Sequence, residues 1–319
     1  MAREWTPSYL LLPGEELQRR AAAALRALRH CRLCPRHCGV DRTSGELGRC
    51  GIGRLALVAD AGPHHGEERC LTGALREGLA ATLGLLGGSG TIFFSGCNLG
   101  CTFCQNWEIS HERRGREVDG RSLSGLMLML QQHSCLNVNL VTPSHVVPQI
   151  LEALNMAAAE GLRLPVVYNT SGYDEVETLR LLDGVVDIYM PDFKLWSQAS
   201  SATYLCAAHY PEKARTAITE MHRQVGDLVL DERGIARRGL LVRHLVMPES
   251  LEESAAIFRW LAGLSRETFV NVMGQYRPAG AAAHDKAAAP GGGQRLDVQE
   301  YRRALAVARA AGLHRAGRW

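Results

Sequence analysis

The part of the chain after residue 90 alternates between short apolar runs and helical patterns. The apolar runs are continuous and rich in β-branched residues, as strands buried on both faces of a parallel sheet should be. They span residues 91–95, 136–141, 166–169, 185–190, 240–246 and 269–273. Helical patterns cover residues 123–133, 147–160, 174–182, 211–225, 251–264 and 297–311. This alternation favours a parallel α/β barrel, closed or partly open, over a sandwich. A complete eight-unit barrel needs about 250 residues, so we expect a six-stranded partial barrel.

The first 90 residues have a different organisation. An amphipathic, alanine-rich helix is expected at 15–30, followed by a cysteine- and glycine-rich knot at 31–53. A strand is expected at 55–59, and Gly62-Pro63 is typical of a turn. We therefore divide the chain into an N-terminal extension, 1–90, and a barrel, 91–319. Late in the barrel, the Ala/Gly-rich run 279–293 predicts a flexible loop.

Composition excludes several classes of function. The chain has 319 residues, 46% of them hydrophobic, which is enough for a large core. A formal charge of +3 does not indicate the strongly basic surface that would bind nucleic acid or an acidic membrane. The start of the chain does not resemble a secretory signal, and the apolar stretch 79–86 is too short to span a bilayer. Ten cysteines without such a signal point to a reducing compartment, so we expect a cytoplasmic protein.

Three cysteines follow the first strand of the predicted barrel. Cys97, Cys101 and Cys104 are spaced four and three residues apart on a glycine-containing loop. Their thiolates suit three corners of a four-iron, four-sulfur (4Fe-4S) cluster, and because no fourth cysteine follows in register, one iron stays open. A zinc site or a set of buried structural thiols is the alternative. Structural zinc sites are closed and four-coordinate, so the spacing favours the iron–sulfur cluster.

This loop resembles the cluster loop of the radical S-adenosylmethionine (SAM) enzymes. The stretch TIFFSGCNLGCTFCQNWEIS, residues 91–110, carries the resemblance, with aromatic Phe103 directly before the last cysteine. The resemblance implies a partial barrel, with SAM on the open iron and Phe103 beside its adenine. Gly96 and Gly100 let the backbone turn tightly near the cluster.

Further segments are similar to one branch of that superfamily, the proteins like pyruvate formate-lyase activating enzyme. These segments are 31–38 (CRLCPRHC) with 45–51, then 62–68 (GPHHGEE), 190–194 (MPDFK) and 275–278 (QYRP). Departures from the pattern are an insertion at 74–88, Gly100 where a basic residue is usual and Gly274 where an acidic one is usual.

The resemblance implies SAM contacts after the second and third strands. Thr142 and Ser144 stand where a Gly-Gly-Glu segment usually contacts the methionine amino group. Asn169 and Ser171 follow the third strand and are expected to reach the methionine carboxylate or the ribose. Ordinary turn-forming or capping roles are the alternative for all four residues.

Asp192 and Lys194 follow the fourth strand and are the candidate catalytic residues. Lys194 is one of three lysines in a chain that otherwise uses arginine, which suggests that a compact ammonium is needed there. Charged groups at the strand ends of barrels often serve catalysis. The alternative is a partly buried salt bridge that fixes the barrel rim.

A second cysteine group lies in the N-terminal knot, formed by Cys31, Cys34, Cys38 and Cys50. Four thiols in so short a segment can close around one metal site, either tetrahedral zinc or a second iron–sulfur cluster. Spacing does not choose between these two, and reduced structural thiols or a disulfide pair are the remaining alternative.

The other reactive side chains have plainer interpretations. Cys70, Cys135 and Cys206 are expected to be buried apolar residues. The histidines and glutamates of GPHHGEE are expected to form a hydrogen-bonded polar loop rather than a ligand set.

These expectations combine into one hypothesis of function. A one-electron donor such as flavodoxin or ferredoxin reduces the cluster, SAM is cleaved reductively, and a 5′-deoxyadenosyl radical abstracts a hydrogen atom from a substrate. The resemblance implies a glycine Cα–H in a partner enzyme, which would make the chain a glycyl-radical activase. Radical modification of another protein or small molecule, and a non-catalytic iron–sulfur or electron-carrier protein, are the alternatives.

Overall fold

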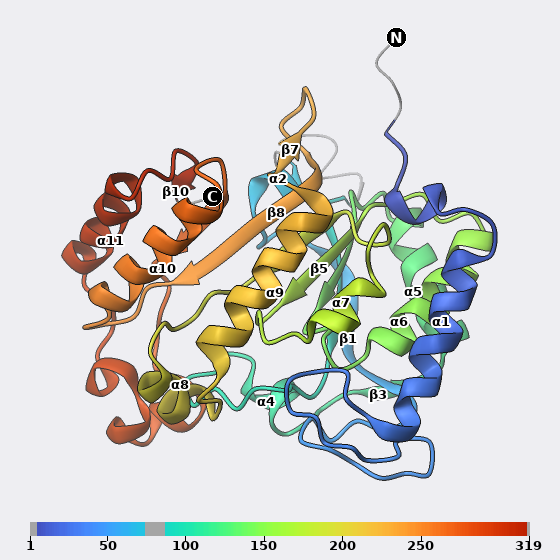
Figure 1. Ribbon diagram of the computed structural model, residues 1–319, viewed down its shortest axis with the longest axis horizontal. Coiled ribbons are helices and arrows are strands. Elements are labelled where there is room, and N and C mark those ends of the chain that lie inside the picture. The colour runs from blue at the N-terminus through green and yellow to red at the C-terminus, as the bar shows by residue number, and fades with distance from the viewer. Residues whose placement is uncertain (1–4, 74–86, 318–319) are drawn as a thin grey trace.

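A curved, mostly parallel β-sheet organises the computed structural model, which describes residues 5–73 and 87–317 (Figure 1). The sheet order is β10-β9-β8-β6-β5-β4-β2-β1-β3, with β7 paired to β8. The strands are β1 (Ala56–His64), β2 (Ser89–Phe94), β3 (Arg116–Val118), β4 (Val138–Val141), β5 (Val166–Thr170), β6 (Ile188–Pro191), β7 (Val229–Leu230), β8 (Ala236–Leu245), β9 (Phe269–Met273) and β10 (Ala316–Gly317).

Six of these strands are the six predicted from the apolar runs. Strands β2, β4, β5, β6, β8 and β9 pair in parallel and in chain order. The end strands β3 and β10 do not pair with each other within the described chain, so the barrel is open. The predicted α/β fold, a six-stranded partial barrel, is therefore confirmed.

Strand β1 differs from its prediction. It continues through Gly62 and Pro63, where a turn was expected, and pairs antiparallel with β2. Proline lacks a backbone N–H, so it is tolerated in strands mainly at edges or irregular positions. Strand β1 comes from the N-terminal extension but belongs to the barrel sheet, with β3 on its far side.

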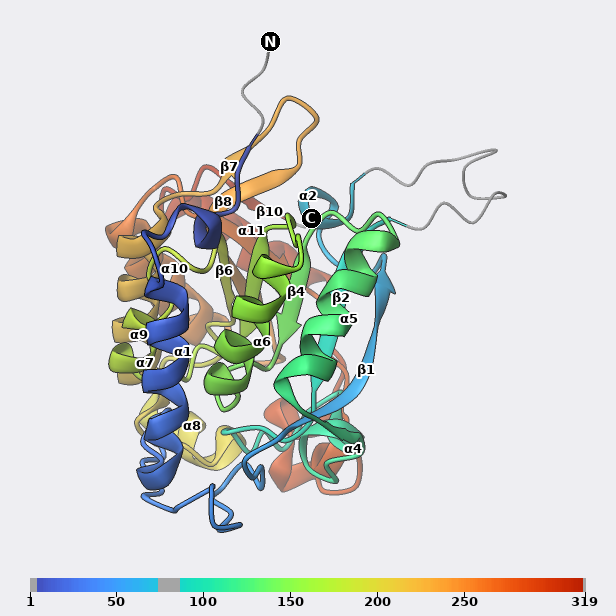
Figure 2. The ribbon, with the colours of Figure 1, turned by 90° about the vertical axis from the view of Figure 1, so that its right-hand side faces the viewer.

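Helices surround the sheet, and the longer ones cover its outer face, as both views of the ribbon show (Figures 1 and 2). They are α1 (Glu16–Arg26), α2 (Arg69–Thr72), α4 (Trp107–Ser110), α5 (Gly120–Gln132), α6 (Val147–Ala159), α7 (Val176–Arg180), α8 (Gln198–Leu205), α9 (Tyr210–Val225), α10 (Leu251–Leu264) and α11 (Val298–Ala310). The short 3-10 helices are η1 (Ser8–Leu11), η2 (Ala27–His30), η3 (Gly280–Ala283), η4 (Lys286–Ala288) and η5 (Pro290–Gly293). In the described ranges, no helix is long and apolar enough to cross a membrane.

Local sequence explains several helix starts. Asp119 caps α5 by accepting a hydrogen bond from the backbone N–H of Ser122 at 2.8 Å. Asp297 and Glu300 form a capping box at the start of α11. Helix α8, which the apolar pattern did not predict, begins at the cap of Ser197. The Ala/Gly-rich run, expected to be a flexible loop, forms the three turns η3, η4 and η5.

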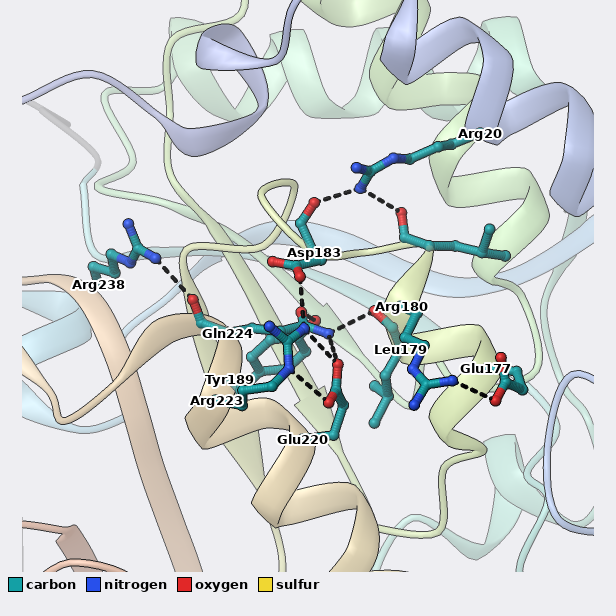
Figure 3. Close-up of polar contacts among 11 residues, drawn as sticks. Arg20, Glu177, Leu179, Arg180, Asp183, Tyr189, Glu220, Arg223, Gln224 and Arg238 are labelled. Atoms are coloured by element: carbon teal, nitrogen blue, oxygen red, sulfur yellow. Dashed lines mark hydrogen bonds and ion pairs between the residues drawn. The ribbon is translucent and has the colours of Figure 1, made fainter.

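A network of polar contacts fixes helices α1, α7 and α9 to the sheet (Figure 3). The hydroxyl of Tyr189, in β6, donates to the side chain of Gln224 at 2.6 Å, and the Gln224 amide donates to the carbonyl of Leu179 at 2.9 Å. Arg223, on α9, bonds Asp183 at 2.6 Å and the adjacent Glu220 at 2.8 Å. These contacts lie on the outer side of the barrel and have a structural role.

The two ends of the barrel differ. At the amino end of β2, helix α2 closes the interior, where Leu71 and Cys70 pack against inward residues of β5, β6, β8 and β9. At the opposite end, both views show α4, α8, the cysteine-rich segment 31–53 and the η3–η5 region gathered together (Figures 1 and 2). This is the carboxyl end of the parallel strands, where α/β barrels place their active sites. Part of the predicted insertion, 74–86, lies outside the described residues.

Candidate active site

The cluster loop follows β2 directly and is held in place by neighbouring segments. The backbone N–H of Gly100 donates to the carbonyl of Leu205 at 3.0 Å, and that of Thr102 donates to Tyr204 at 2.9 Å. The carbonyl of Thr102 in turn accepts from the backbone of η3 at 3.0 Å. Gly96 has a φ of +76°, in the region that favours glycine. The loop is therefore preorganised by backbone contacts to two segments distant in sequence.

The three thiols of this loop lie inside the protein. Cys101 is buried, and Cys97 and Cys104 are partly buried. Burial raises the pKa of Cys97 to about 11 and that of Cys101 further, and each thiol also feels the charge of Cys104. Thiols in such surroundings stay protonated until a metal displaces the proton.

The thiols of the loop are not arranged around one point. No group of three His, Cys, Asp or Glu side chains in residues 5–73 and 87–317 is already arranged to hold a single metal ion. A four-iron cluster binds each thiolate at a different corner, so its ligands need to share a cavity wall rather than a point.

Asp192 and Lys194 lie beside this loop. Their side chains form an ion pair, and both are less than a quarter exposed. Burial opposes the charge of Lys194, but the carboxylate of Asp192 and the thiol of Cys101 outweigh it and raise the lysine pKa. The hydroxyl of Tyr210 accepts from the backbone N–H of Lys194 at 2.9 Å and fixes this segment. The structure thus brings the two predicted catalytic residues to the cluster loop.

Phe103 and Thr142 have defined structural surroundings. The Phe103 ring is buried and meets the ring of Tyr276 edge-on, with centroids 6.1 Å apart. Thr142 has a left-handed backbone, with φ at +62°, and its N–H donates to the carbonyl of Asn169 at 2.9 Å. The ends of β4 and β5 are thereby joined at the level of the predicted SAM contacts.

Ser144 and Ser171 differ from each other. The hydroxyl of Ser144 lies 2.9 Å from that of Thr170, which donates to the buried carboxylate of Asp174 at 2.6 Å. Ser144 is therefore already engaged in a buried network. The hydroxyl of Ser171 is buried and has no hydrogen-bond partner in the structure, so it is the better placed of the two for a ligand.

Sequence reasoning missed a charged cluster inside the barrel. Arg243, in β8, donates to Glu68 at 2.8 Å and also forms an ion pair with Glu67. Asn271, in β9, donates to Glu68 at 2.7 Å. Burial acts to raise the pKa of Glu68, but Arg243 outweighs it and holds that pKa below its ordinary value.

This group of charged residues is linked to the segment beside the cysteine loop, because the backbone of Arg243 forms a parallel β-bridge with that of Asp192. The GPHHGEE segment was expected to be a hydrogen-bonded polar loop, and its glutamates are so bonded. A signal was available in the sequence, since Arg243 is a charged residue within an otherwise apolar strand pattern.

The four cysteines of the N-terminal knot share one small cavity. Cys31, Cys34, Cys38 and Cys50 all line it. Three are buried and Cys38 is exposed. Of the solitary cysteines, Cys70 and Cys135 are buried as expected. Cys206 is exposed, contrary to expectation, because it ends α8 in a left-handed conformation with its thiol 3.4 Å from the carbonyl of Gly100.

Comparison with known proteins identifies a relative that aligns with most of the chain. No known family model matches the chain. The uncharacterized protein MJ0674 of Methanocaldococcus jannaschii is 30% identical over 287 residues, covering 88% of this chain and 74% of the relative. The chain belongs to the MJ0674 family. The aligned length is greater than that of the barrel alone, so the family resemblance includes part of the N-terminal extension.

Two solved structures show partial likeness to this MJ0674-family chain. One is HydG, a maturase of the FeFe-hydrogenase, with a TM-score of 0.48 and 14% identity over 70% of this chain and 48% of HydG. The other is OxsB, a cobalamin-dependent S-adenosylmethionine radical enzyme, with a TM-score of 0.37 and 12% identity over 65% of this chain and 29% of OxsB. The chain thus spans about half of the first and less than a third of the second. Likenesses this distant say nothing of activity or ligands.

Proposed function

We propose that this protein is a radical SAM enzyme whose 4Fe-4S cluster is held by Cys97, Cys101 and Cys104. The observation that carries the proposal is the placement of these thiols. They lie on a backbone-anchored loop at the carboxyl end of β2, inside the mouth of an open parallel barrel. Three cysteines leave one iron free for the amino and carboxylate groups of SAM, as the resemblance of the loop implies. A cluster held there would supply the one electron whose transfer to SAM splits it into methionine and a 5′-deoxyadenosyl radical.

The surrounding residues have complementary roles in this proposal. The ammonium of Lys194, near Cys101, offsets the negative charge of metal-bound thiolates, and Asp192 holds the lysine in place. The unpartnered hydroxyl of Ser171 is offered to polar groups of SAM, and the nearly buried Asn169 is the second candidate contact. Phe103, which is buried in the loop, is the proposed neighbour of the SAM adenine.

The finer proposal concerns the substrate. The barrel mouth has acidic and basic groups, Asp192 and Arg243, below the cluster loop, so a polar substrate fits it better than an apolar one. Resemblance to the activating enzymes points to a glycine Cα–H in a partner protein. Radical modification of another protein or a small molecule is the competing outcome, and an electron carrier that does not cleave SAM is the non-catalytic one.

Anaerobic reconstitution tests the proposal. The protein is loaded with iron and sulfide, then given SAM and dithionite, and the product is analysed for 5′-deoxyadenosine. We expect its release from the wild-type protein and its loss in Cys101→Ala, together with the iron–sulfur absorbance of this site. Cys135→Ala is the matched control, because Cys135 is buried near Gly90 at the amino end of β2.

Two results would contradict the proposal. An intact cluster that persistently fails to release 5′-deoxyadenosine would identify an electron carrier. Unchanged cluster absorbance in Cys101→Ala, measured with the second cysteine group removed, would refute the ligand assignment.

A further inference from the structure

The cavity of the N-terminal knot has the composition of a built metal site. Besides the four thiols, Arg36, Arg42, Arg49, His37 and His145 line it. We propose that Cys31, Cys34, Cys38 and Cys50 hold a second iron–sulfur cluster, which passes electrons from a donor protein to the cluster at Cys97, Cys101 and Cys104. The relay rests on the proposed function, whereas the metal site itself does not.

Arg42 is the strongest evidence for an anionic occupant. It is only 1% exposed, and its guanidinium donates to the carbonyls of Gly53 at 3.1 Å and His145 at 2.8 Å. Its Nη1 lies 3.9 Å from the sulfur of Cys31, and its Nη2 is buried without a partner. A buried guanidinium needs a compensating negative charge.

The cavity itself can supply that charge only through its thiols. Among the described residues that line it, none is an aspartate or glutamate. Neutral thiols would leave Arg42 uncompensated. Four thiolates bound to a metal site carry a net negative charge, and the unpartnered Nη2 atoms of Arg42 and Arg36 are then available as donors to its sulfurs.

The second cysteine group lies directly against the first. Arg36, on the cavity wall, donates to the carbonyl of Asn98 at 2.6 Å, next to Cys97. The carbonyl of Cys50 is so close to Gly96 that a Cβ there would lie 2.7 Å from it. Segments carrying ligands of the two sites are therefore in contact, which is the arrangement that electron transfer between metal centres requires.

The outer edge of the cavity favours a redox role over a purely structural one. Cys38 is exposed, and the backbone N–H of Arg49 donates to its sulfur at 3.4 Å. Arg49 is also exposed, whereas His37 at this edge pairs with Glu175 at 2.8 Å, so Arg49 supplies the basic group that suits an acidic one-electron carrier. One electron passes from the carrier to the second cluster and on to the first, leaving the carrier oxidised by one electron. Zinc has no redox chemistry and would stop this path.

Metal analysis of a variant that lacks the first site tests the assignment. In the triple variant Cys97→Ala, Cys101→Ala, Cys104→Ala, we expect about four irons and four sulfides per chain after anaerobic reconstitution, with no zinc. Wild type and Cys135→Ala should bind about eight irons. Zinc at one equivalent in the triple variant, or no metal at all with unchanged circular dichroism, would overturn the assignment.

The exposed ligand provides a second test that does not require removal of a buried side chain. Cys38→Ser, made in the triple variant, should change the electron paramagnetic resonance spectrum of the reduced protein. A spectrum identical to that of the triple variant would show that Cys38 is not a ligand.

The relay has a separate readout. Reduction of the first cluster is followed by freeze-quench spectroscopy, without SAM, in wild type and in Cys34→Ala, Cys50→Ala. With reduced flavodoxin as the acidic donor, we expect the double variant to slow this reduction at least tenfold, and equal rates would refute the relay. If both clusters load and the relay works but no 5′-deoxyadenosine forms, the proposed function fails and the relay stands. If zinc loads while SAM is cleaved, the reverse holds.

Discussion

Lys194 has two neighbouring groups, Asp192 and Cys101, that its positive charge stabilises. It is held by the carboxylate of Asp192 and lies near the thiol of Cys101, in surroundings that would otherwise oppose a charge. A compact ammonium can serve both neighbours because it is a point charge with three donors. The predicted need for lysine at this position thus has a physical basis in the structure.

Replacing this lysine should affect stability and cluster loading together. Lys194→Met leaves Asp192 without its partner, and we expect a loss of about 2 kcal/mol in the free energy of unfolding. Iron bound at the first site should also fall, since Cys101 loses the cation that favours its thiolate. Urea unfolding and iron analysis measure the two effects. Lys213→Met is the control, because Lys213 forms a longer, 3.3 Å pair with Glu175 and its side chain is 31% exposed, and it should change stability by less than about 1 kcal/mol. Equal effects of the two variants would contradict this role.

The ion pairs of Arg243 are more deeply buried than the pair of Lys194 with Asp192. It pairs with Glu67 and Glu68, whose side chains are 8% and 1% exposed. Arg243→Met should destabilise the protein by about 3 to 5 kcal/mol, because it leaves two buried carboxylates uncompensated. Adding Glu68→Gln should recover part of that loss in a double-mutant cycle.

The control for Arg243 is an arginine whose ion pair is exposed rather than buried. Arg180→Met removes an arginine whose pair with Glu177 is exposed, and it should be nearly neutral. Additivity of Arg243→Met and Glu68→Gln, measured by urea unfolding, would show that the two residues are not coupled.

At the scale of elements, the loop after β2 depends on glycine at one position. Gly96 has a positive φ, and a Cβ there would lie 2.7 Å from the carbonyl of Cys50. Gly96→Ala should therefore lower the free energy of unfolding by about 2 kcal/mol or more and reduce iron binding at both cysteine groups, since the two segments must separate.

Gly125→Ala is the matched control for Gly96→Ala. Gly125 is an exposed glycine within α5, with open space around it, and the change should stabilise the protein by up to about 1 kcal/mol. Wild-type iron content in Gly96→Ala would show that the segments are not coupled.

Periodicity predicted the elements of the barrel because each buried strand is a continuous apolar run. Periodicity failed where strand pairing or a helix cap determines the structure. Gly62 and Pro63 looked like a turn, yet pairing with β2 extends β1 through them. Helix α8 has little apolar periodicity and is set by the cap of Ser197. Such features depend on tertiary contacts and capping rather than on the hydrophobic pattern.

The site was predictable to the extent that its chemistry is local in sequence. The two cysteine groups are short motifs, and the structure places one on the loop after β2 and the other around one small cavity, while their role as metal ligands stays a prediction. The pairing of Arg243 with Glu68 joins residues 175 positions apart, and only the fold brings them together. The same is true of Arg42, whose buried guanidinium reaches His145 across 103 positions.

For the whole molecule, two buried groups act on acid stability in opposite directions. Burial lowers the pKa of His244 to about 4, and burial raises the pKa of Asp187 to about 6. Between pH 6.5 and 4 the unfolded chain protonates His244 and the folded protein does not, so acidification removes stability. Between about pH 6 and 4 the folded protein protonates Asp187 before the unfolded chain does, which partly offsets that loss.

The His244 contribution can be isolated by comparing two proteins across this range. His244 lies between the carbonyl of Phe193 at 2.7 Å and the hydroxyl of Ser254 at 2.9 Å, and a neutral ring satisfies both. In His244→Gln the amide replaces those contacts but does not titrate. From pH 7 to pH 4, urea unfolding of the wild-type protein should therefore lose up to about 3 kcal/mol more stability than the variant loses. The contribution of Asp187 to stability, and any loss of bound metal at low pH, are the same in both proteins and cancel in the difference. Parallel stability curves for the two proteins would show that His244 is not held neutral by the fold.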